Sequence, residues 1–97
     1  ALRTLSCNNN LLTDLDISGN SSNMTFISCK NNRLMTANVQ NGKNTYLLYE
    51  DFRNNPDLYC IKVDDAAYAY TSFAYKDPQA VYYSTTCVLP IEQIENQ

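Results

Sequence analysis

The sequence predicts a mainly β fold, a right-handed solenoid of 22-residue coils with a parallel β-sheet, closed by a small C-terminal cap that contains a short helix. Three observations lead to this class. Apolar residues recur every 22 positions, short apolar–polar alternations accompany them, and 13 of the 97 residues are asparagine, often in pairs or triplets. The expected organisation is repeats over 1–55 with a truncated N-terminal end, a cap over 56–87, and a linker or tail over 88–97.

The repeat is clearest in the first 40 residues. The leading residues of the first unit are Leu2, Leu5, Cys7, Asn10 and Leu12, and 22 positions later stand Met24, Ile27, Cys29, Asn32 and Leu34. The second half of the unit returns in the same way, as Leu15 and Ile17 and then Ala37 and Val39. This spacing is the leucine-rich-repeat pattern, with cysteine in the third apolar position.

Each unit contains two short alternations, such as Leu5-x-Cys7 and Leu15-x-Ile17. Alternation places every second side chain on one face, which is typical of a strand, and both segments are too short for a helix. We therefore expect a parallel strand on the concave side of each coil and an extended or single-turn segment on the convex side. The interleaved polar residues Asp14, Asp16 and Ser18 should face water.

The repeated asparagines are expected to stabilise the bends of the coils. A buried Asn side chain carries both a donor and an acceptor, so it can satisfy backbone groups that leave the strand ladder and stack on its equivalent in the next coil. Asn10 and Asn32 are the clear members, and Asn54 or Asn55 is the third. Sugar binding by these amides is the alternative interpretation.

The third unit is irregular and its register stays open. The apolar segment Tyr46–Tyr49 and then Phe52 fit neither a half nor a whole repeat after Val39. Three elements of a cap follow: a strand over 58–63, a helix over about 66–73 with Asp65 as its N-cap, and a closing strand over 80–84.

The second half of the chain contains residues that resemble a known family of domains. The segment from Asn54 to Tyr68, followed by Cys87, resembles the end of leucine-rich-repeat domains in secreted proteins of Bacteroidetes, especially flavobacteria. Residues 5–18 and 38–45 are similar to repeats of those domains, so the resemblance covers about residues 2–87. In that family a type IX secretion sorting domain often follows, and residues 89–92 resemble the run-up to one. The usual tryptophan of the cap is missing, and Phe73 or Tyr75 stands in its place.

The resemblance implies a secreted or cell-surface interaction module, and it brings no catalytic residues with it. Export would suit a disulfide between Cys60 and Cys87, which lie outside the repeat and bracket the cap. That bond would close a loop of about 27 residues and contribute about 3 kcal/mol. Cys7 and Cys29 occupy one apolar position in consecutive coils, where in-line Cβ vectors make poor disulfide torsions, so we expect two buried thiols.

Composition excludes several classes of function. Seven Lys+Arg against ten Asp+Glu give a net charge of −3, which argues against nucleic acid as a partner. The chain has no histidine, so Ser-His-Asp and Cys-His catalysis, His-ligated zinc and His-ligated haem are excluded. No apolar run is long enough to insert into a membrane, and no Cys-x-x-Cys pair predicts a zinc site. We therefore expect no enzyme, no cofactor and no metal.

A calcium loop is the weaker reading of one segment. Asp14-x-Asp16-x-Ser18 resembles the start of such a loop, but its twelfth position holds Thr25 instead of a bidentate glutamate. A solvated face is the preferred interpretation.

The remaining hypotheses concern binding. Outward positions of the concave strands supply the candidate contact residues, which are Thr4, Ser6, Asn8, Phe26, Ser28 and Lys30. The preferred function is protein binding or adhesion through this face, outside the cell or on a bacterial surface. The alternatives are carbohydrate binding through Tyr and Asn side chains, and a structural spacer. Because the chain opens in mid-repeat, an uncapped apolar N-terminal edge is also expected, which further coils or another chain would cover.

Overall fold

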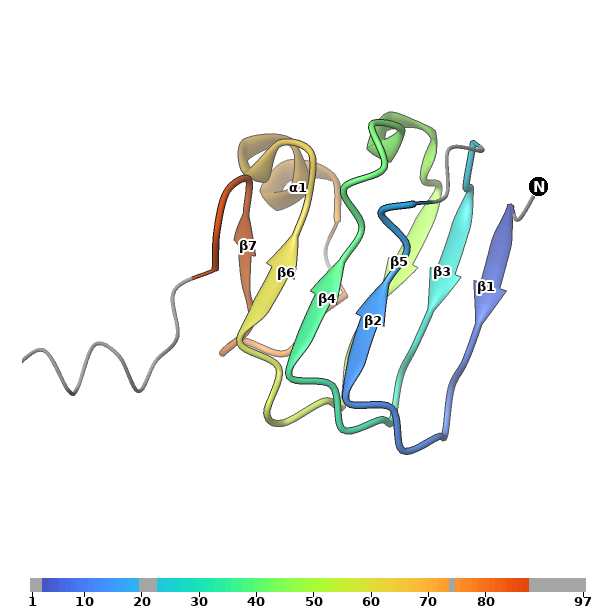
Figure 1. Cartoon of the computed structure of the whole chain (residues 1–97), viewed down its shortest axis with the longest axis vertical. Helices are drawn as coiled ribbons and strands as arrows, with labels where there is room; N and C mark the ends of the chain where they lie inside the picture. Colours follow the sequence, from blue (N-terminus) through green and yellow to red (C-terminus); the bar gives the residue numbers. More distant parts are fainter. Residues whose placement is uncertain (1–2, 20–22, 74, 88–97) are drawn as a thin grey trace, which may run out of the picture.

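The computed structural model describes residues 3–19, 23–73 and 75–87, which form two parallel β-sheets that face each other, with one α-helix (Figure 1). The strands of the first sheet are β1 (Thr4–Ser6), β3 (Phe26–Ser28) and β5 (Tyr49–Asp51). Those of the second sheet are β2 (Asp14–Asp16), β4 (Thr36–Asn38), β6 (Cys60–Lys62) and β7 (Val81–Tyr83). The chain alternates between the sheets up to β6, so the strands of one sheet run opposite to those of the other (Figure 1).

Strand pairing follows the sequence repeat. Leu5 pairs with Ile27 and Leu15 with Ala37, an offset of 22 residues in both sheets. The next pair in the first sheet joins Ile27 to Glu50, an offset of 23. The extra residue lies between β4 and β5, in the segment that holds the 3₁₀-helix η1 (Asn44–Tyr46). This insertion explains why the sequence left the register of the third unit open.

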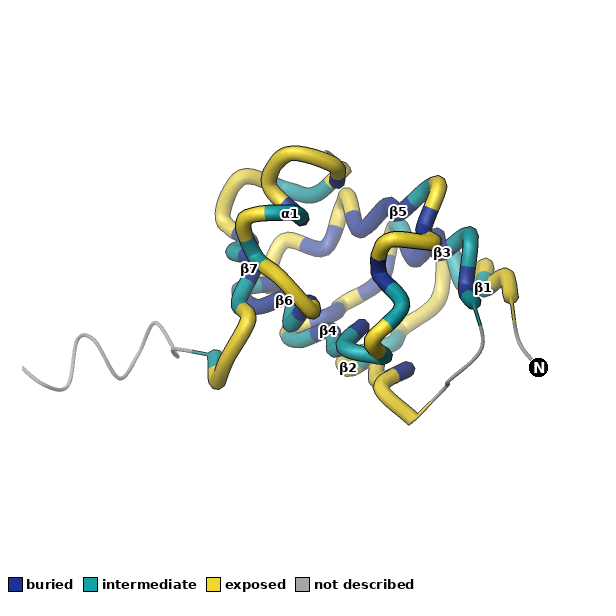
Figure 2. The backbone as a smooth tube through the Cα atoms, turned by 90° about the horizontal axis from the view of Figure 1, so that it is seen from above, coloured by how far each residue is buried: buried dark blue, intermediate teal, exposed yellow. Residues whose placement is uncertain are grey.

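The apolar repeat positions face the space between the two sheets. Met24, Ile27, Leu34 and Val39 are completely buried, and Figure 2 shows buried residues in strands of both sheets. In the first coil Ile17 is also buried, but four other inward residues are only partly buried, namely Leu5, Cys7, Leu12 and Leu15. The predicted alternation of inward and outward side chains is therefore confirmed, and the core becomes complete from the second coil onward.

The second sheet differs from the expected extended or single-turn segment. Four short strands pair there in a regular parallel ladder. The physical reason is the second alternation of the repeat, since Leu15 and Ala37 both point into the core while Asp14 and Asp16 point outward and are exposed.

The cap region agrees closely with its predicted elements. Helix α1 (Ala66–Ser72) begins after Asp65, whose carboxylate accepts the backbone N–H groups of Ala67 and Tyr68, so the predicted N-cap is confirmed. The predicted strands 58–63 and 80–84 are present in shorter form as β6 and β7. Phe73 fills the interior beneath the helix, with its ring 5.8 Å from that of Tyr68, whereas Tyr75 lies outside at 43% exposure.

Both cysteine pairs form disulfides, which corrects the prediction of free thiols at Cys7 and Cys29. In-register residues of neighbouring parallel strands lie close together, and the 4.8 Å between the Cα atoms of Cys7 and Cys29 falls within the range that a disulfide spans. Cys60 and Cys87 are joined as predicted, with 5.9 Å between their Cα atoms. In the part of the chain that the structure describes, no helix has the length and apolar character needed to cross a membrane. The segment 89–92 lies outside the described residues.

Candidate interaction face

The outward side of the first sheet gathers most of the predicted contact residues. Leu5, Ile27 and Glu50 occupy one inward position on the three strands, so their neighbours in the chain point outward. We call this surface the aromatic face; its residues are Thr4, Ser6, Asn8, Phe26, Ser28, Lys30, Tyr49, Asp51 and Arg53, with Tyr75 beside them.

Three aromatic rings form a row across this face. Phe26 and Tyr49 are register partners on β3 and β5, and their rings stack with 5.0 Å between centroids and 16° between planes. Tyr75 continues the row at 5.5 Å from Tyr49, because the Phe52 N–H donates to the Tyr75 carbonyl oxygen at 2.8 Å and holds that segment beside β5. Such pairs contribute beyond the area they bury, so the row is a fixed feature of the surface.

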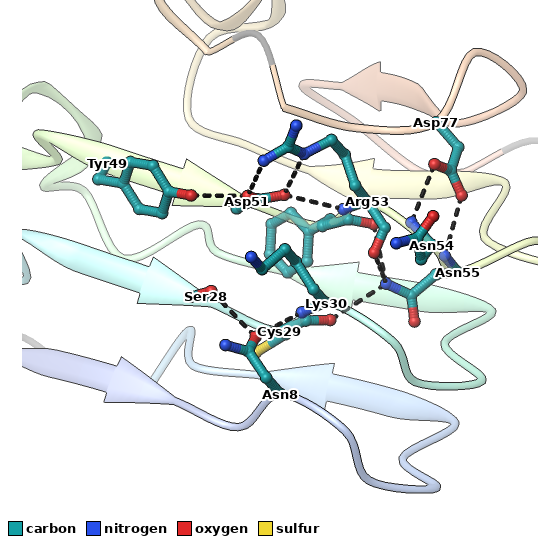
Figure 3. Close-up of polar contacts among 11 residues, drawn as sticks. Asn8, Ser28, Cys29, Lys30, Tyr49, Asp51, Arg53, Asn54, Asn55 and Asp77 are labelled. Atoms are coloured by element: carbon teal, nitrogen blue, oxygen red, sulfur yellow. Dashed lines mark hydrogen bonds and ion pairs between the residues drawn. The ribbon is translucent and has the colours of Figure 1, made fainter.

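Asp51 fixes the side chains that the third coil contributes to the aromatic face, Tyr49 and Arg53. Its Oδ2 lies 2.7 Å from Nη2 of Arg53 and accepts the Tyr49 hydroxyl at 2.6 Å, and its Oδ1 accepts Nε of Arg53 at 3.0 Å (Figure 3). The guanidinium also lies 4.7 Å from the centre of the Tyr75 ring, a cation–π contact. Asp51 is completely buried, whereas the Arg53 side chain is 46% exposed and available to a partner.

The pKa values of this cluster show that its charges are retained. Burial alone would raise the pKa of Asp51, but hydrogen bonds from Arg53 and Tyr49 outweigh it, and the pKa lies below its usual value. The hydrogen bond to Asp51 raises the pKa of Arg53, and the same partner raises the pKa of the Tyr49 hydroxyl. The pair is therefore ionised at neutral pH.

The other side of the face is held by Asn8. Its Oδ1 accepts the Ser28 hydroxyl at 2.9 Å and the Lys30 backbone N–H at 2.7 Å (Figure 3). Ser28 is only 3% exposed, so it supports the face from beneath and does not offer the free contact that the sequence suggested. Arg53–Asp51 is the one ion pair among the described residues, which leaves the Lys30 amine without an acidic partner there.

The asparagine ladder lies at the bends that follow the first sheet. Asn32 Nδ2 donates to the Cys7 carbonyl oxygen at 3.0 Å, and its Oδ1 accepts the backbone N–H of Asn10 at 3.1 Å. Asn55, which is completely buried, repeats this with the Cys29 carbonyl oxygen at 3.1 Å and the Leu34 N–H at 3.2 Å. The amides of Asn32 and Asn55 thus join consecutive coils. Their donors and acceptors are used in hydrogen bonds to the backbone, and both side chains are buried, so they are not free to bind a sugar.

Asn54 has a different role from the one suggested for it. Its φ of 61° places it in the left-handed region, as do Asn9 at 62° and Asn31 at 59° in the two earlier coils. Asparagine tolerates this conformation better than most residues, so each Asn-Asn pair combines a bend residue with a ladder residue. After Asn55 the ladder ends on Asp77, which accepts the backbone N–H groups of Asn54 and Asn55 at 2.9 Å each.

A cavity of about 410 Å³ lies at the opposite end of the coils. It is lined by Gln40, Gly42, Asn44, Thr45, Asp64, Asp65 and Tyr68. Both carboxylate oxygens of Asp64 accept backbone N–H groups, from Gly42 at 3.1 Å and Asn44 at 3.0 Å, so this acid closes the turn that forms the cavity wall.

The residues of the predicted calcium-loop alternative, Asp14, Asp16 and Ser18, form hydrogen bonds with one another or with a neighbouring strand. Asp14 Oδ1 accepts the Thr36 hydroxyl at 2.8 Å, and Asp16 Oδ1 accepts the Ser18 hydroxyl at 2.6 Å. Hydrogen bonds from Ser18 lower the pKa of Asp16. Within the described ranges no group of three or more Asp, Glu or Cys residues is placed to hold a metal ion.

Sequence reasoning missed the part of the face that comes from the third coil, namely Tyr49, Asp51, Arg53 and Tyr75. An offset of 23 instead of 22 would have found three of these, since Phe26, Ser28 and Lys30 then align with Tyr49, Asp51 and Arg53. Tyr75 follows the helix and has no counterpart in the repeat. No family model, curated protein or solved structure matched the chain.

Proposed function

We propose that the chain is part of a leucine-rich-repeat solenoid with a C-terminal cap, secreted or exposed on a bacterial surface, and that its aromatic face binds a partner protein. The 22-residue strand offsets, the buried amide ladder and the right-handed path expected of parallel crossovers support the solenoid. The resemblance to secreted domains of Bacteroidetes supports a bacterial origin and export from the cell. Two disulfides support an oxidising location outside the cytoplasm.

The observation that carries the binding proposal is the rigid combination of Tyr49, Tyr75 and Arg53 around buried Asp51. Tyrosine and arginine are among the residues most enriched where protein interfaces concentrate their binding energy. Because the Asp51 hydrogen bonds already fix these side chains, less conformational entropy is lost when a partner binds.

We infer binding without catalysis or a cofactor. Asp51 is the acid best placed on this face, and its two oxygens accept three side-chain hydrogen bonds from Arg53 and Tyr49. Its role is therefore to position these two side chains.

Carbohydrate binding is the second candidate, and the cavity beside α1 favours it. The cavity offers the Tyr68 ring and the Thr45 hydroxyl, and its volume lies within the range of small-molecule sites. A glycan array would support this candidate if Tyr68→Ala and Thr45→Ala removed a signal that Lys30→Glu left intact. If neither surface binds anything, the structural spacer remains.

The test of the main proposal is retention of surface proteins from bacterial cultures on the immobilised chain. We expect at least one protein to be retained by the wild type and lost with Lys30→Glu and with Tyr75→Ala. Lys62→Glu is the matched control, because Lys62 lies on β6 at a comparable, partly exposed position of the second sheet. Equal retention by Lys30→Glu and Lys62→Glu would contradict binding through the aromatic face.

A further inference from the structure

The aromatic row is open at one end. Strand β3 lies between β5 and β1, so Tyr49 covers one side of the Phe26 ring and Thr4 is its register partner on the other side. Tyr49 stacks at 5.0 Å, but the short side chain of Thr4 cannot cover a phenyl ring. Thr4 is exposed and Phe26 is half-buried, so the side of the Phe26 ring that faces β1 has no aromatic neighbour, and the surface above Thr4 is open.

The groups around this space favour an acidic partner. Lys30 follows Phe26 by four residues on the same face, which corresponds to about 13 Å along extended chain. Its amine has no acidic partner among the described residues, whereas the half-exposed Arg53 guanidinium nearby is already paired with Asp51, so Lys30 supplies the unpaired positive charge. The exposed hydroxyls of Thr4 and Ser6 line the near side of the space.

We propose that the space above Thr4 receives a Phe or Tyr side chain from an extended, acidic segment of the partner protein, and that a carboxylate four residues further along this segment pairs with Lys30. This inference rests on the proposed function and names the chemistry of its partner. The incoming ring continues the Phe26–Tyr49–Tyr75 row at the spacing that those rings already have. Residues four apart in an extended segment point to the same side, so the ring and the carboxylate reach the face together.

The probe is a set of three synthetic peptides: acetyl-Tyr-Gly-Thr-Gly-Glu-amide, the same peptide with Ala for Tyr, and the same peptide with Gln for Glu. Titration into the labelled chain, followed by NMR, should shift the signals of Thr4, Phe26 and Lys30 in a saturable way. We expect at least tenfold weaker binding of each altered peptide. Shifts confined to the second sheet, or equal affinity for all three peptides, would overturn the proposal.

A substitution that fills the space gives the sharper test. Thr4→Tyr supplies the missing ring from the chain itself and should reduce peptide affinity at least tenfold, whereas Thr4→Ser keeps the space and should preserve binding. Thr13→Tyr is the matched control, since Thr13 is also an exposed threonine and lies directly before β2, away from the aromatic face. Unchanged affinity of the Thr4→Tyr variant would overturn the inference.

Failure of this inference can be told apart from failure of the proposed function. If a surface protein is lost with Lys30→Glu but retained by Thr4→Tyr, the face binds its partner and the ring assignment is wrong. If no surface protein depends on Lys30 and no peptide shifts Thr4 or Phe26, both proposals are wrong.

Discussion

The first and third coils place different chemistry in the same positions of the first sheet. Leu5 is apolar but only half-buried, whereas Glu50, at the equivalent position, is 2% exposed. Asn10 is exposed, whereas its counterpart Asn55 is completely buried. The comparison teaches that burial here depends on whether a coil has neighbours on both sides, and not on the polarity of its residue.

The largest expected difference between the two coils concerns their ladder asparagines. Asn55→Ala should lower the free energy of unfolding by about 4 kcal/mol, because it leaves buried carbonyl oxygens of Cys29 and Phe52 and the N–H of Leu34 without partners. Asn10→Ala should cost less than about 1 kcal/mol, since water can replace an exposed amide. Urea denaturation of both variants measures this, and equal losses would mean that the first coil is as well covered as the third.

The buried glutamate should make the stability of the third coil depend on pH. Burial raises the pKa of Glu50 to about 8, and the charge of Asp51 adds to this, while the Tyr82 hydroxyl and the Lys76 charge oppose it. Oε1 is the one buried side-chain polar atom without a hydrogen-bond partner among the described residues. The Tyr82 hydroxyl donates to the other oxygen, Oε2, at 3.3 Å, and burial followed by the Glu50 charge raises the pKa of Tyr82.

The direction of the effect follows from proton linkage. The folded state holds the Glu50 proton more tightly than the unfolded state, so this stability is complete below pH 4.5 and is lost as the pH rises toward about 8. The slope should approach about 1.4 kcal/mol per pH unit within that window. Glu50→Gln should flatten it and leave the variant about 3 kcal/mol more stable than wild type at pH 8. Identical slopes for the two proteins would show that Glu50 is ionised in the folded state.

The Cys7–Cys29 disulfide should stabilise mainly the first coil. Cys7 and Cys29 share their position with Phe52, so a disulfide joins the first two coils where the third relies on packing. Replacing both cysteines by Ala should cost about 3 kcal/mol, the loss expected for a closed loop of this size. Hydrogen exchange should become faster at the N–H groups of Cys7 and Asn9, which bond to the second coil, and stay unchanged at Phe52. A uniform increase over all coils would contradict a local role.

The smallest effect concerns the open end of the aromatic row. Thr4→Tyr should raise the free energy of unfolding by about 0.5–1 kcal/mol, because the new ring stacks on Phe26 and no buried residue is changed. Thermal unfolding beside Thr13→Tyr provides the control. A destabilised Thr4→Tyr protein would indicate that the space beside Phe26 is narrower than a ring.

Much of the first two coils could be predicted from the sequence. Identical offsets between Leu5 and Ile27 and between Asn10 and Asn32 fixed the inward positions and the ladder, and the Asp65 cap located α1. The expectation of free thiols at Cys7 and Cys29 was wrong, because the poor torsions expected of in-line Cβ vectors were given more weight than the short distance between paired strands, which permits a bridge. The choice between Asn54 and Asn55 needed backbone angles, which two adjacent identical residues do not reveal.

Sequence by itself determined the period of the coils, the residues that point inward and the elements of the cap, because side-chain alternation and capping are local properties of the chain. Only the tertiary structure decided the register of the third coil and which of its residues are buried. One extra residue near η1 moves Glu50 into the core and brings Tyr49, Asp51 and Arg53 beside Phe26 and Lys30. The path after α1 then brings Tyr75 to the same row. The aromatic face depends on contacts between segments that are 20 or more residues apart, and no local pattern encodes which of these segments lie side by side.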